Sequence, residues 1–173
     1  MAKHAFNRSR RAFLRGSRTS LEEDLPLPWS IRQKIEDGCT RCGACARACP
    51  QKIIVNGDGG LPTLSFRNTS CTFCQACAEA CEEDLFNLEA PAPWNLQAVI
   101  LDTCLAKANI HCESCRDICG LSAIRFRPEI GRAPRPAIDA DRCTGCGACV
   151  SVCPADSITI TDPSGRPDRE LGS

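Results

Sequence analysis

Two stretches of the sequence, CTRCGACARACP at residues 39–50 and CTGCGACVSVCP at residues 143–154, share one spacing of cysteine and proline. Both follow C-x2-C-x2-C-x3-C-P, the run that binds [4Fe–4S] clusters in bacterial ferredoxins. Two-residue gaps let three thiolates on one tight loop reach three irons of a cubane, and the proline after the fourth cysteine stops a helix. Small residues such as Gly43 and Gly147 let backbone amides approach the inorganic sulfurs.

Two further groups of four cysteines lie between these stretches. CTFCQACAEACE (71–82) keeps the spacing, but Glu82 replaces the proline. In the third group, CLAKANIHCESCRDICG (104–120), a wider loop separates Cys104 from Cys112, and His111 is interpreted as an ordinary loop residue because four thiols are already present. The predicted metal ligands are all sixteen cysteines: Cys39, Cys42, Cys45, Cys49, Cys71, Cys74, Cys77, Cys81, Cys104, Cys112, Cys115, Cys119, Cys143, Cys146, Cys149 and Cys153.

The compartment decides whether such cysteines form disulfides or bind metal. SRRAFLRG (9–16), with Arg10 and Arg11, looks like the start of a twin-arginine export signal. The residues that follow contain three consecutive acids and two prolines instead of an apolar run of about 7–15 residues. No later segment approaches the ~20 apolar residues of a membrane span. We therefore expect a cytoplasmic protein with reduced, metal-binding thiols.

Zinc is the competing interpretation of clustered cysteines. Structural zinc sites usually combine two C-x2-C pairs separated by a longer spacer. The compact groups fit that pattern poorly, so the sequence predicts four [4Fe–4S] clusters as cofactors.

The composition predicts a small α+β fold that depends on its metal. The 173 residues include six Phe, two Trp and no Tyr, which is little for a packed core. Short apolar runs around a turn at 56–60, and a similar pattern at 124–139, predict β-hairpins between the groups. Each unit is then a cysteine loop, a short helix carrying the fourth cysteine, and short strands. The cluster-free chain is expected to be largely unfolded.

We predict tandem bacterial-ferredoxin-like dicluster modules. A basic, flexible segment (1–30) precedes a module with groups one and two (31–89), a linker (90–97), a module with groups three and four (98–162) and a flexible tail (163–173). In ferredoxins of this type the fourth cysteine of one motif ligates the partner motif's cluster. Pairing one with two and three with four is the simplest arrangement, and nested pairing of one with four and two with three remains open.

Local charge suggests a difference in reduction potential. Glu79, Glu82, Glu83 and Asp84 surround group two, and negative charge disfavours adding an electron. The cluster of group two is therefore expected to have a lower potential than that of group one, where Arg41, Arg47 and Lys52 lie.

The four-group layout, the widened third group, the SAIRFRP after it, and the PW before the first group resemble the NapF family. These are ferredoxin-type accessory proteins of periplasmic nitrate reductase systems. The resemblance covers nearly the whole chain and implies a cytoplasmic protein with four [4Fe–4S] clusters held by all sixteen cysteines. It also implies binding to the precursor of the nitrate reductase catalytic subunit and a role in its maturation, through cluster loading before export.

Other functions receive less support from the sequence. A soluble polyferredoxin, or an electron-transfer subunit of a redox complex, remains the alternative function. An enzyme is not expected, because the chain has no dinucleotide loop, no P-loop and no convincing base–nucleophile set. Zero net charge argues against nucleic acid as a partner, and no membrane span is expected.

Overall fold

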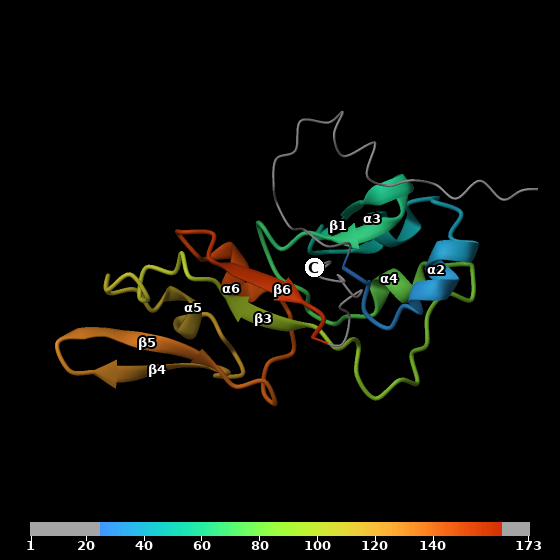
Figure 1. Cartoon of the computed structure of the whole chain (residues 1–173). Helices are drawn as coiled ribbons and strands as arrows, with labels where there is room; N and C mark the ends of the chain where they lie inside the picture. The colour runs from blue at the N-terminus through green and yellow to red at the C-terminus, as the bar shows by residue number, and fades with distance from the viewer. Residues whose placement is uncertain (1–24, 164–173) are drawn as a thin grey trace, which may run out of the picture.

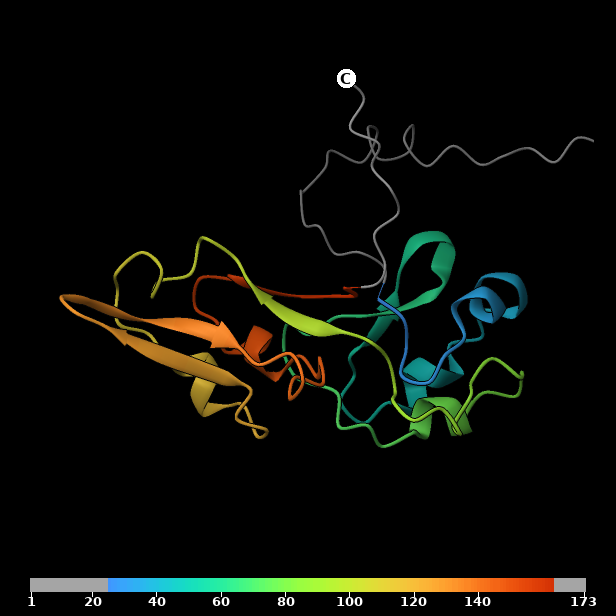
Figure 2. The same cartoon turned by 60° about the horizontal axis from the view of Figure 1, so that its bottom comes forward.

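The computed structural model describes residues 25–163, which form two lobes lying side by side (Figure 1). The first lobe runs from helix α2 to helix α4, and the second from strand β3 to strand β6. The hairpin of the second lobe lies at the end farthest from the first lobe in both views (Figures 1 and 2). Most of the predicted basic segment, including Arg10 and Arg11, and nearly all of the predicted tail lie outside the described residues.

The first lobe contains three short helices and one hairpin. Its elements in order are α2 (Arg32–Gly38), α3 (Ala44–Ala48), β1 (Ile54–Asn56), the 3-10 turn η1 (Asp58–Gly60), β2 (Pro62–Leu64) and α4 (Ala76–Glu79). Strands β1 and β2 pair antiparallel with Ile54 opposite Leu64. The hairpin predicted between groups one and two is therefore confirmed.

The second lobe repeats this plan with longer strands. Its elements are β3 (Gln97–Ile100), α5 (Ser114–Asp117), β4 (Ile124–Glu129), β5 (Arg132–Ile138), α6 (Ala148–Ser151) and β6 (Ile158–Thr161). Strands β4 and β5 form the predicted hairpin between groups three and four. Strand β6 returns to pair antiparallel with β3.

In each lobe, the segment before the first cysteine group pairs with the segment after the second group. In the second lobe these are β3 and β6, and in the first lobe a single antiparallel bridge joins Ser30 to Phe86. This closure brings the segment before the first cysteine loop of a lobe next to the segment after the second loop. The two cysteine groups of each lobe are thereby enclosed together.

The helices correct one detail of the sequence prediction. Each short helix carries the third cysteine of its group, not the fourth: Cys45 lies in α3 and Cys149 in α6. The fourth cysteine follows the helix end, as Cys49 does with an extended backbone. About one helical turn, roughly 5 Å, therefore separates the third and fourth ligands of a group.

The hydrophobic core is small and partly made of cysteine, as the composition predicts. Leu27 and Leu96 are almost fully enclosed, with 1% and 2% of their surface exposed. The core cluster also contains four cysteines: Cys49, Cys77, Cys115 and Cys149. Within residues 25–163, no helix has both the length and the apolar character that a bilayer crossing needs.

Candidate iron–sulfur centres

Three of the four cysteine loops share one backbone conformation. In each of these loops two residues have positive φ. One lies two positions after the first cysteine, and the other directly follows the second cysteine. These positions are Arg41 and Gly43 in group one, Phe73 and Gln75 in group two, and Gly145 and Gly147 in group four. Non-glycine residues rarely adopt this conformation and do so mainly at functional sites. The repeated backbone turns three thiols of each loop toward one volume.

Site A combines three cysteines of group one with one of group two. Cys39, Cys42, Cys45 and Cys81 line one cavity of about 320 Å³ in the first lobe. The Cys42 side chain is exposed there and Cys39, Cys45 and Cys81 are half-buried. The fourth ligand position of the group-one loop is therefore filled by the last cysteine of the other group.

Site B has the reciprocal composition. Cys71, Cys74 and Cys77 of group two share a small cavity with Cys49 of group one, and Cys74 is exposed there. The thiols of Cys49 and Cys77 are buried. Because α3 carries Cys45 of site A and is followed directly by Cys49 of site B, this helix links the two sites.

Site C lies in the second lobe and contains the widened loop. Cys104, Cys112 and Cys115 line one cavity together with Cys153 of group four. The inserted residues between Cys104 and Cys112 are anchored to β5, because the Ala133 amide donates a 2.7 Å hydrogen bond to the Asn109 side chain. The longer gap therefore keeps Cys104 among the ligands.

Site D contains the remaining four cysteines. Cys143, Cys146 and Cys149 lie on one loop with the same two positive-φ positions as the loops of groups one and two, which brings the three thiols together. By the arrangement of the other three sites, we infer that Cys119 of group three completes the set. Helices α5 and α6, which precede Cys119 and Cys153, pack against each other as α3 and α4 do in the first lobe.

The structure thus selects one of the two pairings left open by the sequence. Group one exchanges its fourth cysteine with group two, and group three exchanges with group four. Nested pairing is wrong. His111 is exposed in the loop before Cys112, outside the residues that line site C.

The exchange also corrects the prediction about potentials. Glu82 and Glu83 follow Cys81 and line site A, together with Arg41 and Arg47. Two of the four acids next to group two in sequence therefore face the site of the group-one loop, where two arginines oppose their effect, while Glu79 and Asp84 are not among its lining residues. The sequence-based prediction placed Glu82 and Glu83 at the wrong site, because cysteine spacing does not reveal the exchange of the fourth cysteine.

Burial dominates the electrostatics of the thiols. It raises the pKa of Cys77 to about 12, with a further contribution from the charge of Cys71. It likewise raises the pKa of Cys149 to about 12 and that of Cys115 to about 11. At exposed Cys42 the pKa is lowered, first by the backbone amide of Ala44 and then by the Thr40 side chain. Buried thiols of this kind ionise when a metal compensates the thiolate charge.

Several backbone amides donate to thiol sulfurs. The amide of Ala123 lies 3.3 Å from Cys119 Sγ, that of Ser157 lies 3.2 Å from Cys153 Sγ, and that of Phe73 lies 3.4 Å from Cys71 Sγ. Such bonds stabilise thiolate and cluster charge and tune the reduction potential. The chain therefore offers four-thiol sets with amide donors, which fit a [4Fe–4S] cubane.

The lining of the cavities shows how the predicted ligands are placed. Across residues 25–163, no three His, Cys, Asp or Glu side chains gather closely enough to hold one metal ion. The predicted ligands instead surround cavities from several sides. The sequence identified all of these cysteines, while the residues with positive φ at Arg41, Phe73 and Gln75 carry no signal that identifies them in advance.

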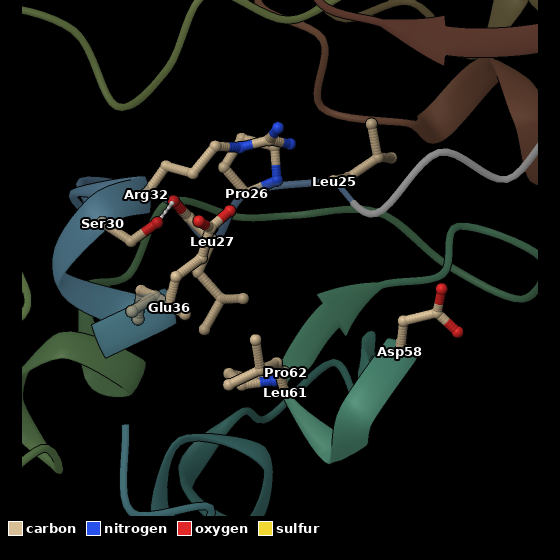
Figure 3. Close-up of a pocket in the computed structure, with 10 residues that line it drawn as sticks. Leu25, Pro26, Leu27, Ser30, Arg32, Glu36, Asp58, Leu61 and Pro62 are labelled. Atoms are coloured by element: carbon tan, nitrogen blue, oxygen red, sulfur yellow. Dashed lines mark hydrogen bonds between the residues drawn. The ribbon is translucent and has the colours of Figure 1, made fainter. Parts of the chain in front are cut away.

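A further pocket lies beside site A (Figure 3). It shares Ile35 and Pro62 with that site and is otherwise lined by a mixed set: Leu25, Pro26, Leu27, Ser30, Arg32, Glu36, Asp58 and Leu61. The Ser30 hydroxyl donates a 2.8 Å hydrogen bond to the Leu27 carbonyl at its wall. The pocket contains no cysteine and shows no set of converging groups for catalysis.

The comparisons with known proteins agree with this geometry. The 4Fe-4S dicluster domain family matches residues 38–85 and 110–157, one match in each lobe. The ferredoxin-type protein NapF of Haemophilus influenzae is 41% identical over 167 residues, covering 90% of this chain and 95% of that protein. NapF of Escherichia coli K12 is 41% identical over 152 residues, covering 87% of this chain and 93% of that protein.

A more distant relative is the methylamine utilization ferredoxin-type protein MauM of Methylobacillus flagellatus. It is 29% identical over 170 residues, covering 86% of this chain and 72% of that protein. The resemblance inferred from the widened third group is confirmed by the two nearer matches. The chain belongs to the NapF family of ferredoxin-type proteins and contains two 4Fe-4S dicluster domains.

Proposed function

We propose that this chain is a cytoplasmic protein with one [4Fe–4S] cluster in each of sites A to D. We further propose that it assists maturation of the catalytic subunit of periplasmic nitrate reductase before export. The proposed ligands are the sixteen cysteines, and the proposed partner is the precursor of that subunit.

The observation that carries the proposal is the exchange of the fourth cysteine. It gives sites A, B and C four protein thiols each, and site D by the same arrangement, so every iron of a cubane would have a cysteine and none would be left open for a substrate. A protein with such sites holds or passes clusters and electrons rather than converting a small molecule. Membership of the NapF family supports a role in the nitrate reductase system.

The spacing of the sixteen cysteines supports the proposed compartment. Clustered cysteines of an intracellular protein stay reduced and bind metal, whereas those of an exported protein form disulfides. The Arg10–Arg11 head, which lies outside the described residues, would let the protein engage the partner or machinery that handles a true twin-arginine signal.

A second candidate is a soluble electron carrier. The close contact between the cysteine loops of the two lobes favours it, because the Cys71 amide donates a 2.8 Å hydrogen bond to the Cys146 carbonyl. Tightly held clusters that are reversibly reduced would support this role, and clusters that leave the protein would support maturation.

Anaerobic co-purification tests the proposal. The cluster-loaded chain is tagged and mixed with the catalytic subunit in two forms, the precursor and the exported mature enzyme. We expect capture of the precursor only, followed by movement of isotope-labelled iron from the chain into it. Absence of capture while all clusters are intact would refute the maturation role and leave the electron carrier.

Paired variants test the head in the same experiment. Arg10→Ala/Arg11→Ala is expected to lose capture of the precursor. Arg15→Ala/Arg18→Ala removes the same charge from the same segment and is expected to retain capture. Equal loss in both would assign the effect to general basic charge.

A further inference from the structure

We propose that the two lobes are docked to make sites B and D neighbours, so that the four sites form one electron-transfer row in the order A, B, D, C. The inference rests on the four clusters of the proposed function but not on the maturation role. The order differs from the order of the groups in the chain, because the loops of groups two and four meet at the boundary between lobes.

A backbone hydrogen bond joins the two loops at their ligands. The amide of Cys71, the first ligand of site B, donates to the carbonyl of Cys146, the second ligand of site D, at 2.8 Å. When the main chains of two residues share a hydrogen bond, the two residues are direct neighbours in space. The ligand shells of sites B and D are therefore adjacent.

The approach of the lobes requires a residue without a side chain. A Cβ atom on Gly147 would lie 2.2 Å from Phe66 Cδ1 and 2.3 Å from Phe66 Cγ. Phe66 belongs to the first lobe, just after β2, and only 5% of its surface is exposed. The Gly147 backbone also has a φ of +85°. The buried ring therefore sits directly against the main chain of the group-four loop.

Aromatic side chains complete the boundary. The Trp94 indole N–H donates a 2.7 Å hydrogen bond to the Thr144 carbonyl in the group-four loop. Its ring lies 5.3 Å from that of Phe73, in the group-two loop, and 6.4 Å from that of Phe66. Trp94 thus contacts both loops and fixes their relative position. A hydrogen-bonded, aromatic-packed boundary is expected to be rigid.

Sites A and C then take the ends of the row. In both views α5, which carries Cys115 of site C, lies farther from the first lobe than α6, which carries Cys149 of site D (Figures 1 and 2). In the first lobe the cysteine-loop residues that contact the boundary, Cys71 and Phe73, belong to the loop of site B, which leaves site A at the end. An external one-electron donor, such as a reduced flavin or iron–sulfur protein, would give its electron at one end. Clusters held in B and D would pass that electron across the boundary, one being oxidised as the other is reduced, and a one-electron acceptor protein at the other end would take it up, with no bond made or broken.

Spin coupling tests the B–D contact. Cys42→Ala/Cys112→Ala removes one ligand from site A and one from site C and leaves B and D loaded. After reduction with dithionite, we expect an electron paramagnetic resonance spectrum broadened by coupling between two clusters. The matched variant Cys74→Ala/Cys146→Ala leaves A and C and is expected to give an uncoupled spectrum. Two loaded clusters without coupling in the first variant would overturn the row while leaving the cluster count and the maturation role intact.

Hydrogen exchange provides a second test that keeps all ligands. Gly147→Ala is expected to speed exchange of the Cys71 amide roughly tenfold or more, because the inserted methyl group opens the boundary. Gly131→Ala is the control, since Gly131 also has positive φ (+72°) but a Cβ there meets nothing within 4 Å. Protection of Cys71 that is unchanged by Gly147→Ala would overturn the proposed docking, even if the ligand variants fail to load.

Discussion

Replacing Cys81 by alanine should remove the cluster of site A, although Cys81 belongs to group two. The reason is that Cys81 lines the same cavity as Cys39, Cys42 and Cys45. Four clusters hold about 16 irons, so the loss of one site lowers the content to about 12. Cys42→Ala should cause the same loss, since it removes another ligand of the same site.

Double variants turn this into a test of the exchange. Cys81→Ala/Cys42→Ala should still hold about 12 irons, because both changes affect one site. Cys81→Ala/Cys74→Ala should fall to about 8, because Cys74 belongs to site B. Iron and acid-labile sulfide per chain, measured after anaerobic purification, provide the readout. The opposite pattern, with the larger loss in Cys81→Ala/Cys42→Ala, would refute the exchange of the fourth cysteine.

Three further predictions follow from the sites. Gly145→Ala should destabilise the loaded protein by roughly 2–5 kcal/mol in thermal unfolding, because its Cβ would lie 2.4 Å from the Leu96 carbonyl oxygen at positive φ. Gly59→Ala, with the same φ of +65° and open space, should cost only about 1–2 kcal/mol, and equal losses would contradict the argument. Bipyridyl should remove about half of the iron in a fast phase, because Cys42 of site A and Cys74 of site B are exposed while the cysteines of the second lobe are buried or half-buried; a single phase for all the iron would count against this. The cluster-free chain should be largely unfolded by circular dichroism. Any remaining helical signal should fall as the pH rises from 9.0 toward 12. Burial raises the pKa of Cys149 from 9.0 to about 12 in the folded form, so the thiol ionises first in the unfolded chain and the folded form loses stability over this range. A helical signal that increases over this range would contradict the sign.

The sequence predicted the chemistry of the sites better than their arrangement. Cysteine spacing is a local property, so it identified every candidate ligand and the hairpins between groups. The pairing of Cys81 with the group-one loop depends on how two loops pack, and successive groups spaced almost equally along the chain do not encode it. The same limit explains why Glu82 was assigned to the wrong site.

The boundary between the lobes was also beyond sequence reasoning. The stretch 90–97 was predicted as a linker because of its prolines. Two residues of this stretch, Trp94 and Leu96, nevertheless contact the group-four loop. Gly147 was interpreted as giving amides access to the cluster. The structure adds a second reason for glycine there, which is the close approach of Phe66, and it places Gly145 equally close to Leu96. Contacts of this kind depend on tertiary packing between distant residues and leave no periodic pattern in the chain.

Native mass spectrometry of the anaerobically purified chain would show whether it holds four clusters, because it counts clusters on single intact molecules. We expect one main species that carries four [4Fe–4S] clusters, with stepwise loss of whole clusters as the collision energy rises. A main species with zinc, or one that carries only two clusters in chains with all sixteen cysteines intact, would contradict this expectation.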